Sequence, residues 1–289
     1  KDLTAPSSIA ACVKHFAAYG APEGGREYNT VDMSEYRLRA EYLLPYKAGI
    51  DAGAASIMTA FNDLNGIPAT GNKWLLRDIL RDEWGFNGLV VTDWQTIEEM
   101  EYHGFTKDLS ESAEIALEAG TDVDMMASAF VDHLPDLIRD GQVDEKLLDD
   151  AVRNVLRVKF ELGLFDDPYQ YSDRQREESE IRTEDHRQLA RDIARKSIVL
   201  LKNKGNILPL EQDQKIALIG PFVDDKAEHN GTWSLFAEAK DVVSIWEGFS
   251  SSVTDGQLVK AKGCDFTARD EKALQQAVET ASNSDIVLM

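Results

Sequence analysis

Residues 88–94 read GLVVTDW, and this stretch indicates the fold more clearly than any other part of the chain. A continuous apolar run that ends in polar residues is typical of a parallel strand buried on both faces. Three further runs have the same character, at residues 9–16, 56–61 and 121–126. Helix-like stretches at 34–48, 73–82 and 109–118 separate the four runs. The alternation predicts successive βα units, which form either half of an eight-stranded barrel or most of an open parallel sheet.

The rest of the chain predicts two more helices and then a second α/β unit. The helices are expected over residues 131–139 and from the N-cap Asp144 to Gly163, where one face is apolar. Residues 166–187 are polar and charge-dense, with Ile181 as the only aliphatic side chain, and we interpret them as a linker. The second unit starts with a helix from Thr183. Its strand candidates are 198–201, 215–220, 259–261 and 286–289, with a helix over 274–281 before the last.

Composition and charge disfavour several classes of protein. The 289 residues are 43% apolar and 29% charged, which is typical of a globular protein of roughly two domains. The formal charge of −21 disfavours nucleic-acid binding, and no apolar run reaches the roughly 18 residues that span a membrane. Cys12, Cys264 and the histidines lack metal-site spacing, so no metal is expected. The chain starts without Met and ends in an apolar run, so we expect a piece of a longer protein.

The carboxyl ends of the four predicted strands hold the candidate site, because active sites of barrels and open α/β sheets form at this edge. Asp93 follows its strand directly and precedes Trp94. This places a carboxylate beside a large aromatic ring. A sugar-binding site needs both, because the apolar face of a sugar stacks on an aromatic ring and its hydroxyls need charged or amide partners. The other polar residues at strand ends are Lys14 and His15, Asn62 and Asp63, and Asp122 and Asp124.

These candidates also have plain structural interpretations. Asp93 could cap a helix or stabilise a turn, and Lys14 could be a solvated strand end or a Schiff-base lysine. His15 could be a general base or a buried histidine with satisfied hydrogen bonds. The charge run Glu98-Glu99-Met100-Glu101 is interpreted as a solvated helix face. The Gly-rich loop 24–29 lacks the spacing of a phosphate-binding motif, so no nucleotide is expected there.

Several longer stretches, taken in order, carry a family resemblance. They are VKHFAAYG at 13–20, GGREYNTVDMS at 24–34, NGIPAT at 65–70, the segment from Leu75 to Phe86, and GLVVTDW at 88–94. The match continues through residues 159–168 and SIVLLKN at 197–203. Together these motifs resemble those of glycoside hydrolase family 3, and most closely its bacterial β-glucosidases.

The resemblance implies an α/β fold in which the later portion of a (β/α)8 TIM-type barrel is followed by the start of an α/β sandwich domain. We therefore expect three segments. Residues 1–163 would be the C-terminal portion of the barrel catalytic domain, 164–187 a linker, and 188–289 the N-terminal portion of the sandwich domain.

The resemblance also implies a retaining glycoside hydrolase that removes non-reducing terminal β-D-glucosyl residues from β-glucosides and cello-oligosaccharides. Asp93 matches the aspartate of the family's (S/T)-D-W motif, and is thus expected to be the nucleophile that forms a covalent glycosyl-enzyme. Lys14 and His15 match a Lys-His pair that grips sugar hydroxyls, and Trp94 matches an aromatic residue that clamps the next sugar. Phe61 is the fourth residue expected at the substrate.

Three departures from the family pattern qualify these expectations. Phe61 stands where many relatives have the Tyr of a Tyr-x-x-x-Asn-Gly pattern, so a hydroxyl that could orient the nucleophile is missing, and a water or another loop would have to replace it. The early Asp and Arg sugar ligands are expected upstream of Lys1, and the acid/base Glu in a loop beyond Met289. This piece alone is therefore expected to be close to inactive. The related N-acetylglucosaminidase branch is disfavoured, because residues 17–32 contain no His.

The alternative within the family is a β-xylosidase or α-arabinofuranosidase with a different sugar pocket. A non-enzymatic sugar-binding relative and a Schiff-base aldolase acting through Lys14 are more distant readings. No cofactor is expected. The expected partners are a β-linked glucoside or oligosaccharide and the remainder of the parent polypeptide. A homodimer is compatible with the resemblance. Neither nucleic acid nor a membrane is expected as a partner. By resemblance the protein is periplasmic or secreted.

Overall fold

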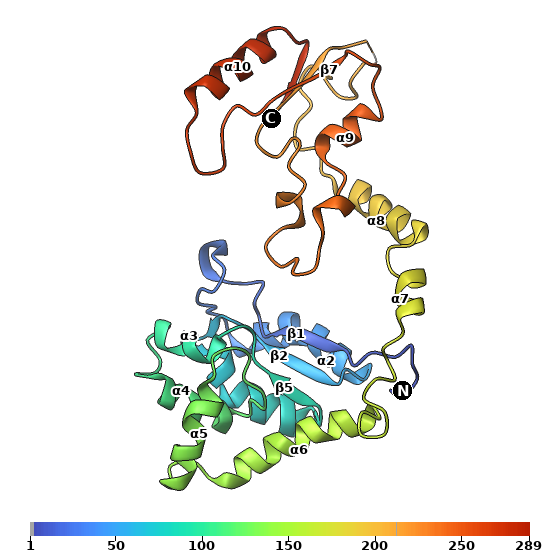
Figure 1. The fold of residues 1–289 in the computed structure, drawn as a ribbon. Coiled ribbons are helices and arrows are strands. Elements are labelled where there is room, and N and C mark those ends of the chain that lie inside the picture. Colours follow the sequence, from blue (N-terminus) through green and yellow to red (C-terminus); the bar gives the residue numbers. More distant parts are fainter. Residues whose placement is uncertain (1–2, 212) are drawn as a thin grey trace. The chain divides into compact units, whose positions relative to one another are not determined.

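The computed structural model describes residues 3–211 and 213–289, which divide into the two compact units of Figure 1. Unit 1 runs to Thr183, and unit 2 starts at Glu184. Residues 1 and 2 of the expected barrel segment, and residue 212 of the expected sandwich segment, lie outside the described residues. The expected linker 164–187 contains α7 (Arg174–Glu180) of unit 1 and the first residues of α8 (Glu184–Ser197).

Unit 1 is built on a parallel sheet. Strands β1 (Cys12–Phe16), β2 (Ser56–Thr59) and β5 (Leu89–Val91) pair in the order β1-β2-β5. The prediction of parallel strands is confirmed for these three apolar runs. The fourth run forms only an isolated bridge between Val91 and Val123, and beyond it Met126 and Ser128 have left-handed backbone conformations that a strand does not contain. In the described part of the chain this sheet is open, with no closed barrel.

Helices connect the strands at the places that the apolar periodicity predicted. After β1 a continuous helical stretch is formed by α1 (Glu35–Arg37), η2 (Leu38–Tyr42) and α2 (Leu43–Asp51), and the Ser34 side chain caps its first turn. The π-type helix η4 (Trp74–Glu83) lies between β2 and β5. Asp144 caps α6 as predicted, and its carboxylate accepts from Lys146 N at 3.0 Å. The other elements of unit 1 are η1 (Glu23–Gly25), β3 (Asp63–Leu64), β4 (Ile67–Pro68), η3 (Ala69–Gly71), α3 (Thr96–Tyr102), α4 (Leu109–Ala119), α5 (Ala129–Arg139) and α6 (Glu145–Glu161).

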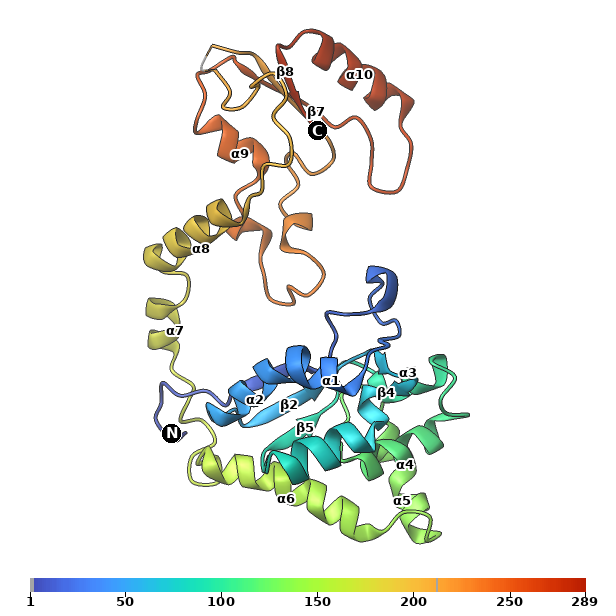
Figure 2. The same cartoon turned by 180° about the vertical axis from the view of Figure 1, so that it is seen from behind.

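Two apolar clusters stabilise unit 1, and both contribute to holding the strand ends in place. The first joins the sheet to η4, with Phe16, Ile57 and Val90 fully buried among the side chains of that helix. The second packs α3 to α6 against one another around Ile97 and Met100. Figure 2, the view from behind, shows α6 running below β5, which it also contacts. No helix in the described ranges combines the length and the apolar character needed to cross a lipid bilayer.

Unit 2 contains a second parallel sheet. Strand β6 (Ile216–Ile219) lies between β7 (Leu258–Ala261) and β8 (Ile286–Leu288), which confirms three of the predicted strands. The fourth candidate, residues 198–201, is not a strand: no described strand takes up its backbone hydrogen bonds, and its four side chains are between 62% and 92% exposed. The remaining elements of unit 2 are η5 (Glu228–Asn230), η6 (Ala239–Asp241), α9 (Ile245–Ser250) and α10 (Glu271–Ser282).

Candidate active site

The carboxyl edge of the unit 1 sheet brings Asp93 and His15 into direct contact. His15 lies in β1 and Asp93 follows β5, two strands that are not neighbours in the sheet. The Nε2 atom of His15 is nonetheless 3.1 Å from Oδ2 of Asp93. Because β2 runs between these strands, the residues that follow its carboxyl end, Phe61 among them, emerge at the same edge.

Asp93 is buried, with 7% of its surface exposed, and both carboxylate oxygens have partners. Oδ1 accepts from the backbone N–H of Trp94 at 2.7 Å, and Oδ2 faces His15. The residue at the N-cap position of α3 is Gln95, so Asp93 does not cap that helix. A carboxylate held at two points at the end of a buried strand has a defined orientation, which a nucleophile or general base requires.

The environment of His15 favours the neutral imidazole. Burial lowers the pKa of His15 below its usual 6.5, and the positive charge of Lys14 adds to this, while the negative charge of Asp93 opposes it. The carbonyl of His15 accepts a hydrogen bond from the Tyr46 hydroxyl, which fixes this part of β1. The structure thus places a neutral imidazole beside the Asp93 carboxylate, with Nε2 of His15 3.1 Å from Oδ2.

Lys14 has a different environment, with its side chain exposed at the same edge. The nearest polar contact of its Nζ atom is the sulfur of Met58, at 3.9 Å. Among the described residues no carboxylate forms an ion pair with this ammonium group. Apart from this weak contact with sulfur, its donor hydrogens are available for a hydroxylated ligand.

An aromatic cluster forms one wall beside these residues. The ring of Phe61 is covered by Tyr28 and Tyr19, with centroid distances of 4.6 Å and 5.5 Å. Only 6% of Phe61 is exposed, so its ring lies beneath the two tyrosines. Tyr19 also meets the His15 ring edge-on at 5.3 Å. Trp94 is 41% exposed and presents an open aromatic surface directly after Asp93.

The loop after β1 is held against the loop after β2, and this contact explains two of the sequence motifs. Asn65 and Gly66 have φ values of 53° and 86°, as the two central residues of a tight hairpin turn between β3 and β4 require. The Asp63 carboxylate accepts from Thr30 Oγ1 at 2.7 Å and from Gly66 N at 2.9 Å. The Asn65 amide bonds both backbone groups of Met33. The loops that carry Tyr28 and Phe61 are therefore fixed relative to each other.

Glu99, on α3, is a further carboxyl group close to Asp93. Its Oε2 atom is closed to solvent and has no hydrogen-bond partner. Burial, with the nearby charges of Asp93 and then Glu98, raises the pKa of Glu99 to about 7. The interpretation of residues 98–101 as a solvated helix face is wrong for Glu99 and for Met100. Met100 is fully buried in the second apolar cluster, and one carboxyl oxygen of Glu99 is closed to solvent.

Asp122 and Asp124, the other carboxylates at strand ends, have structural partners. Asp122 pairs with Arg81 at 2.6 Å and accepts from Val90 N at 2.7 Å, which ties η4 to β5. Desolvation raises the pKa of Asp122, although Arg81 opposes the shift. Asp124 accepts from the backbone N–H groups of Ala127 and Phe130, both at 3.3 Å. These carboxylates organise the backbone and leave Asp93 as the candidate reactive group.

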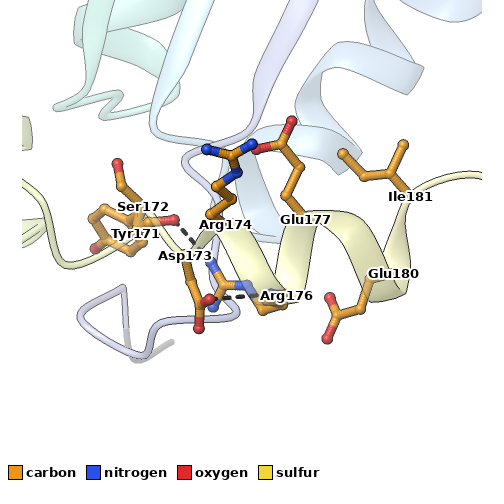
Figure 3. Close-up of a pocket in the computed structure, with 8 residues that line it drawn as sticks. All are labelled: Tyr171, Ser172, Asp173, Arg174, Arg176, Glu177, Glu180 and Ile181. Carbon is orange, nitrogen blue, oxygen red and sulfur yellow. Dashed lines mark hydrogen bonds between the residues drawn. The ribbon is translucent and has the colours of Figure 1, made fainter.

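A pocket of about 850 Å³ lies elsewhere in unit 1, along α7 (Figure 3). Charged side chains of both signs line it, and Arg176 is held there by the Asp173 carboxylate and the Tyr171 carbonyl. None of its lining residues is a predicted site residue. Throughout residues 3–211 and 213–289, no group of three His, Cys, Asp or Glu side chains is arranged to hold a metal ion.

Four side chains that lie close to Asp93 or Phe61 were not singled out from the sequence as site residues: Tyr19, Tyr28, Glu99 and His103. His103 Nε2 contacts the carbonyl oxygen of Phe61 at 3.0 Å. For Glu99 the sequence did hold a signal. Thr96, Ile97 and Met100 have the spacing of one buried helical face, and Glu99 lies at the border of that face. The tyrosines and His103 come close only through the loop and helix packing, which leaves no local pattern.

Two family models match the chain. The Glycosyl hydrolase family 3 N terminal domain matches residues 3–158, and the Glycosyl hydrolase family 3 C-terminal domain matches residues 198–289. The chain is 47% identical over 266 residues to a periplasmic β-glucosidase of Salmonella typhimurium, covering 90% of this chain and 34% of that protein. It is 36% identical over 299 residues to a β-xylosidase of Formosa agariphila, covering 97% of this chain and 41% of that protein.

Solved structures show the same relationship. The crystal structure of a β-glucosidase from Listeria innocua has a TM-score of 0.82 and 40% identity, covering 100% of this chain and 39% of that one. A mutant of that enzyme in complex with laminaribiose has a TM-score of 0.81, at 40% identity over 99% of this chain and 39% of that one. The chain thus spans between 34% and 41% of the length of these relatives.

Proposed function

The chain belongs to glycoside hydrolase family 3, and from this premise we propose that its protein is a retaining exo-glycosidase with β-glucosidase activity. It would remove non-reducing terminal β-D-glucosyl residues from β-glucosides and cello-oligosaccharides. The observation that carries the proposal is the buried Asp93 carboxylate at the end of β5, held by Trp94 N and His15. The β-glucosidase names of the Salmonella and Listeria relatives support the choice of glucose.

In the proposed reaction Asp93 attacks the anomeric carbon as the leaving oxygen departs, which forms a covalent glycosyl-enzyme that water then hydrolyses. Trp94 N–H and His15 hold the two oxygens of the attacking carboxylate. The reaction needs a second carboxyl about 5 Å from the first, acting as acid and then as base. We assign the role to a carboxylate outside these 289 residues.

We propose that Lys14, His15, Trp94 and Phe61 form the sugar-binding part of this chain. The exposed ammonium of Lys14 suits sugar hydroxyls as a donor. Trp94, 41% exposed, offers a ring on which the apolar face of a sugar can stack. Phe61 would contribute from beneath the tyrosines that cover it.

The proposed architecture follows the expected segments. Residues 1–163 would be the later portion of a (β/α)8 barrel, 164–187 a linker, and 188–289 the start of an α/β sandwich domain. The parallel order β1-β2-β5, extended by the bridge to Val123, supports a barrel segment. The periplasmic name of the Salmonella relative supports a periplasmic or secreted location.

A β-xylosidase or α-arabinofuranosidase is the alternative, favoured by the Formosa β-xylosidase, which is 36% identical over 97% of this chain. Glucose and xylose differ by one hydroxymethyl group, and the discrimination depends on whether the pocket hydrogen-bonds its hydroxyl: about 10- to 200-fold without such a bond, and about 10⁴-fold or more with one. Side-by-side rates on aryl β-D-glucoside and aryl β-D-xyloside therefore decide between the two substrates. A higher kcat/KM on the xyloside would favour the alternative.

Replacing Asp93 by asparagine in the full-length protein tests the proposal. Loss of the nucleophile should lower kcat on an aryl β-glucoside by about 10⁴-fold or more, with the melting temperature preserved. Asp132→Asn, an exposed aspartate on α5, is the matched control and should keep wild-type turnover. Near-normal turnover by Asp93→Asn would refute the assignment.

A further inference from the structure

Tyr28 packs on the buried ring of Phe61 and is the side chain of this pair that faces solvent. The two rings meet edge to face at 4.6 Å, with an interplanar angle of 63°. Phe61 is 6% exposed, whereas Tyr28 is 41% exposed. A ligand that approaches this wall therefore meets Tyr28, and Phe61 serves as the apolar support behind it.

The backbone holds Tyr28 in this place. Its φ of 66° is in the left-handed region, which a bulky residue adopts only when the surrounding structure enforces it. Glu23 N bonds Thr30 O at 2.9 Å across the loop, and the Thr30 side chain is anchored to Asp63 at 2.7 Å. The loop is thus fastened to the hairpin after β2 two residues beyond Tyr28. Such strain at an exposed aromatic residue is typical of functional positions.

A chain of contacts leads from Tyr28 to Asp93. The ring of Tyr28 meets Tyr19 at 6.3 Å, Tyr19 meets His15 at 5.3 Å, and His15 contacts Asp93 at 3.1 Å. Burial and the negative charges of Glu27, Glu99 and Asp93 raise the pKa of the Tyr28 hydroxyl. This hydroxyl therefore stays protonated and can donate a hydrogen bond at the edge where Asp93 lies.

We propose that Tyr28 is a substrate-contacting residue that presents an aromatic face and a hydroxyl donor to the sugar bound at Asp93. This inference rests on the proposed function and adds a specificity-determining residue to it. The ring would stack on the apolar face of a pyranose, and the hydroxyl would donate to one of its oxygens. No bond is made or broken by Tyr28, so its contribution lies in binding and orienting the sugar.

Two substitutions in the full-length protein separate these contributions. Tyr28→Phe keeps the ring on Phe61 and removes only the hydroxyl, so kcat/KM on an aryl β-glucoside should fall by about three- to tenfold, with the larger change in KM. Tyr28→Ala also removes the stacking surface and should lower kcat/KM by about a further tenfold. The inhibition constant of glucose should rise in parallel with KM, because Tyr28 would contact the same sugar in substrate and product. A purely structural role would not weaken the binding of glucose selectively.

Tyr36→Phe is the matched control, since Tyr36 is 83% exposed on α1 and contacts no residue of the site. It should leave KM and the inhibition constant of glucose unchanged. If Tyr28→Ala does not fold, the isosteric Tyr28→Phe variant decides. Wild-type KM and glucose inhibition in Tyr28→Phe would overturn the proposal.

The test also separates this inference from the proposed function. If the wild-type protein turns over an aryl β-glucoside or xyloside and Asp93→Asn abolishes it, the function stands whatever Tyr28 does. If the wild-type protein hydrolyses neither glycoside, the proposed function fails, and the inference fails with it because Tyr28 then has no sugar to contact.

Discussion

Replacing Glu99 by glutamine should stabilise unit 1 at alkaline pH and change its stability little in acid. The Oε2 atom of Glu99 is closed to solvent and has no hydrogen-bond partner, and Asp93 is a nearby negative charge. These surroundings disfavour the ionised carboxylate, which raises the pKa of Glu99 from its usual 4.5 to about 7. Glutamine has nearly the same shape as the protonated acid and cannot ionise.

The sign and size of the effect follow from proton linkage. Between pH 4.5 and about 7 the folded state holds a proton that the unfolded state has lost, so the free energy of unfolding decreases as the pH rises through this range. The full shift corresponds to about 3 kcal/mol. Because Glu99 is only half-buried, solvent screening reduces this to about 1 to 2 kcal/mol. For a unit that runs to Thr183 this is about 2 to 8 °C in the melting temperature.

The assay compares melting temperatures of wild type and Glu99→Gln in the full-length protein, at about pH 5 and about pH 8.5. The transition of unit 1 should shift upward in the variant at the higher pH and by a much smaller amount at the lower pH. Glu101→Gln, on the same helix and with the same change of charge, is the control and should shift the transition by less than about 1 °C at both pH values. An equal shift of Glu99→Gln at both pH values would refute the argument, since it would show that the ionisation of Glu99 is not what costs stability.

Three further outcomes are expected. Arg81→Met leaves the carboxylate of Asp122 buried without the guanidinium partner that lies at 2.6 Å, and should lower the free energy of unfolding by about 3 to 5 kcal/mol. Denaturant titrations measure this, and a loss below about 1 kcal/mol would contradict the pairing. Gly88→Ala would place a methyl group 2.2 Å from the carbonyl oxygen of Ala55, so we expect a destabilisation of about 3 kcal/mol or more, and wild-type stability would show that the strands can separate at no cost. Burial lowers the pKa of His15, so stability should fall as the pH drops through the range just below 6.5, and the imidazole resonances should titrate there; a midpoint at or above 6.5 would be inconsistent with the site.

The local pattern of the sequence predicted much of unit 1. The apolar runs at 9–16, 56–61 and 88–94 contain the strands Cys12–Phe16, Ser56–Thr59 and Leu89–Val91, because the strand side chains that face the core must be apolar and this requirement is visible in the sequence. The helix start at Asp144 was also predictable from the local sequence, because a capping side chain bonds backbone groups only two or three residues away. Residues 198–201 have the same apolar character as a strand, yet a strand also needs a neighbour, and no described strand lies beside them.

The candidate site shows the same division between local and distant information. The sequence alone indicated Asp93, because its position directly after an apolar run places it at the functional edge of a parallel sheet. Only the tertiary structure decided that His15 contacts this carboxylate, that Tyr28 covers Phe61, and that one carboxyl oxygen of Glu99 is closed to solvent. Such pairings depend on strand order and on how two loops fasten to each other, so they join residues that are far apart in the chain and have no period in common.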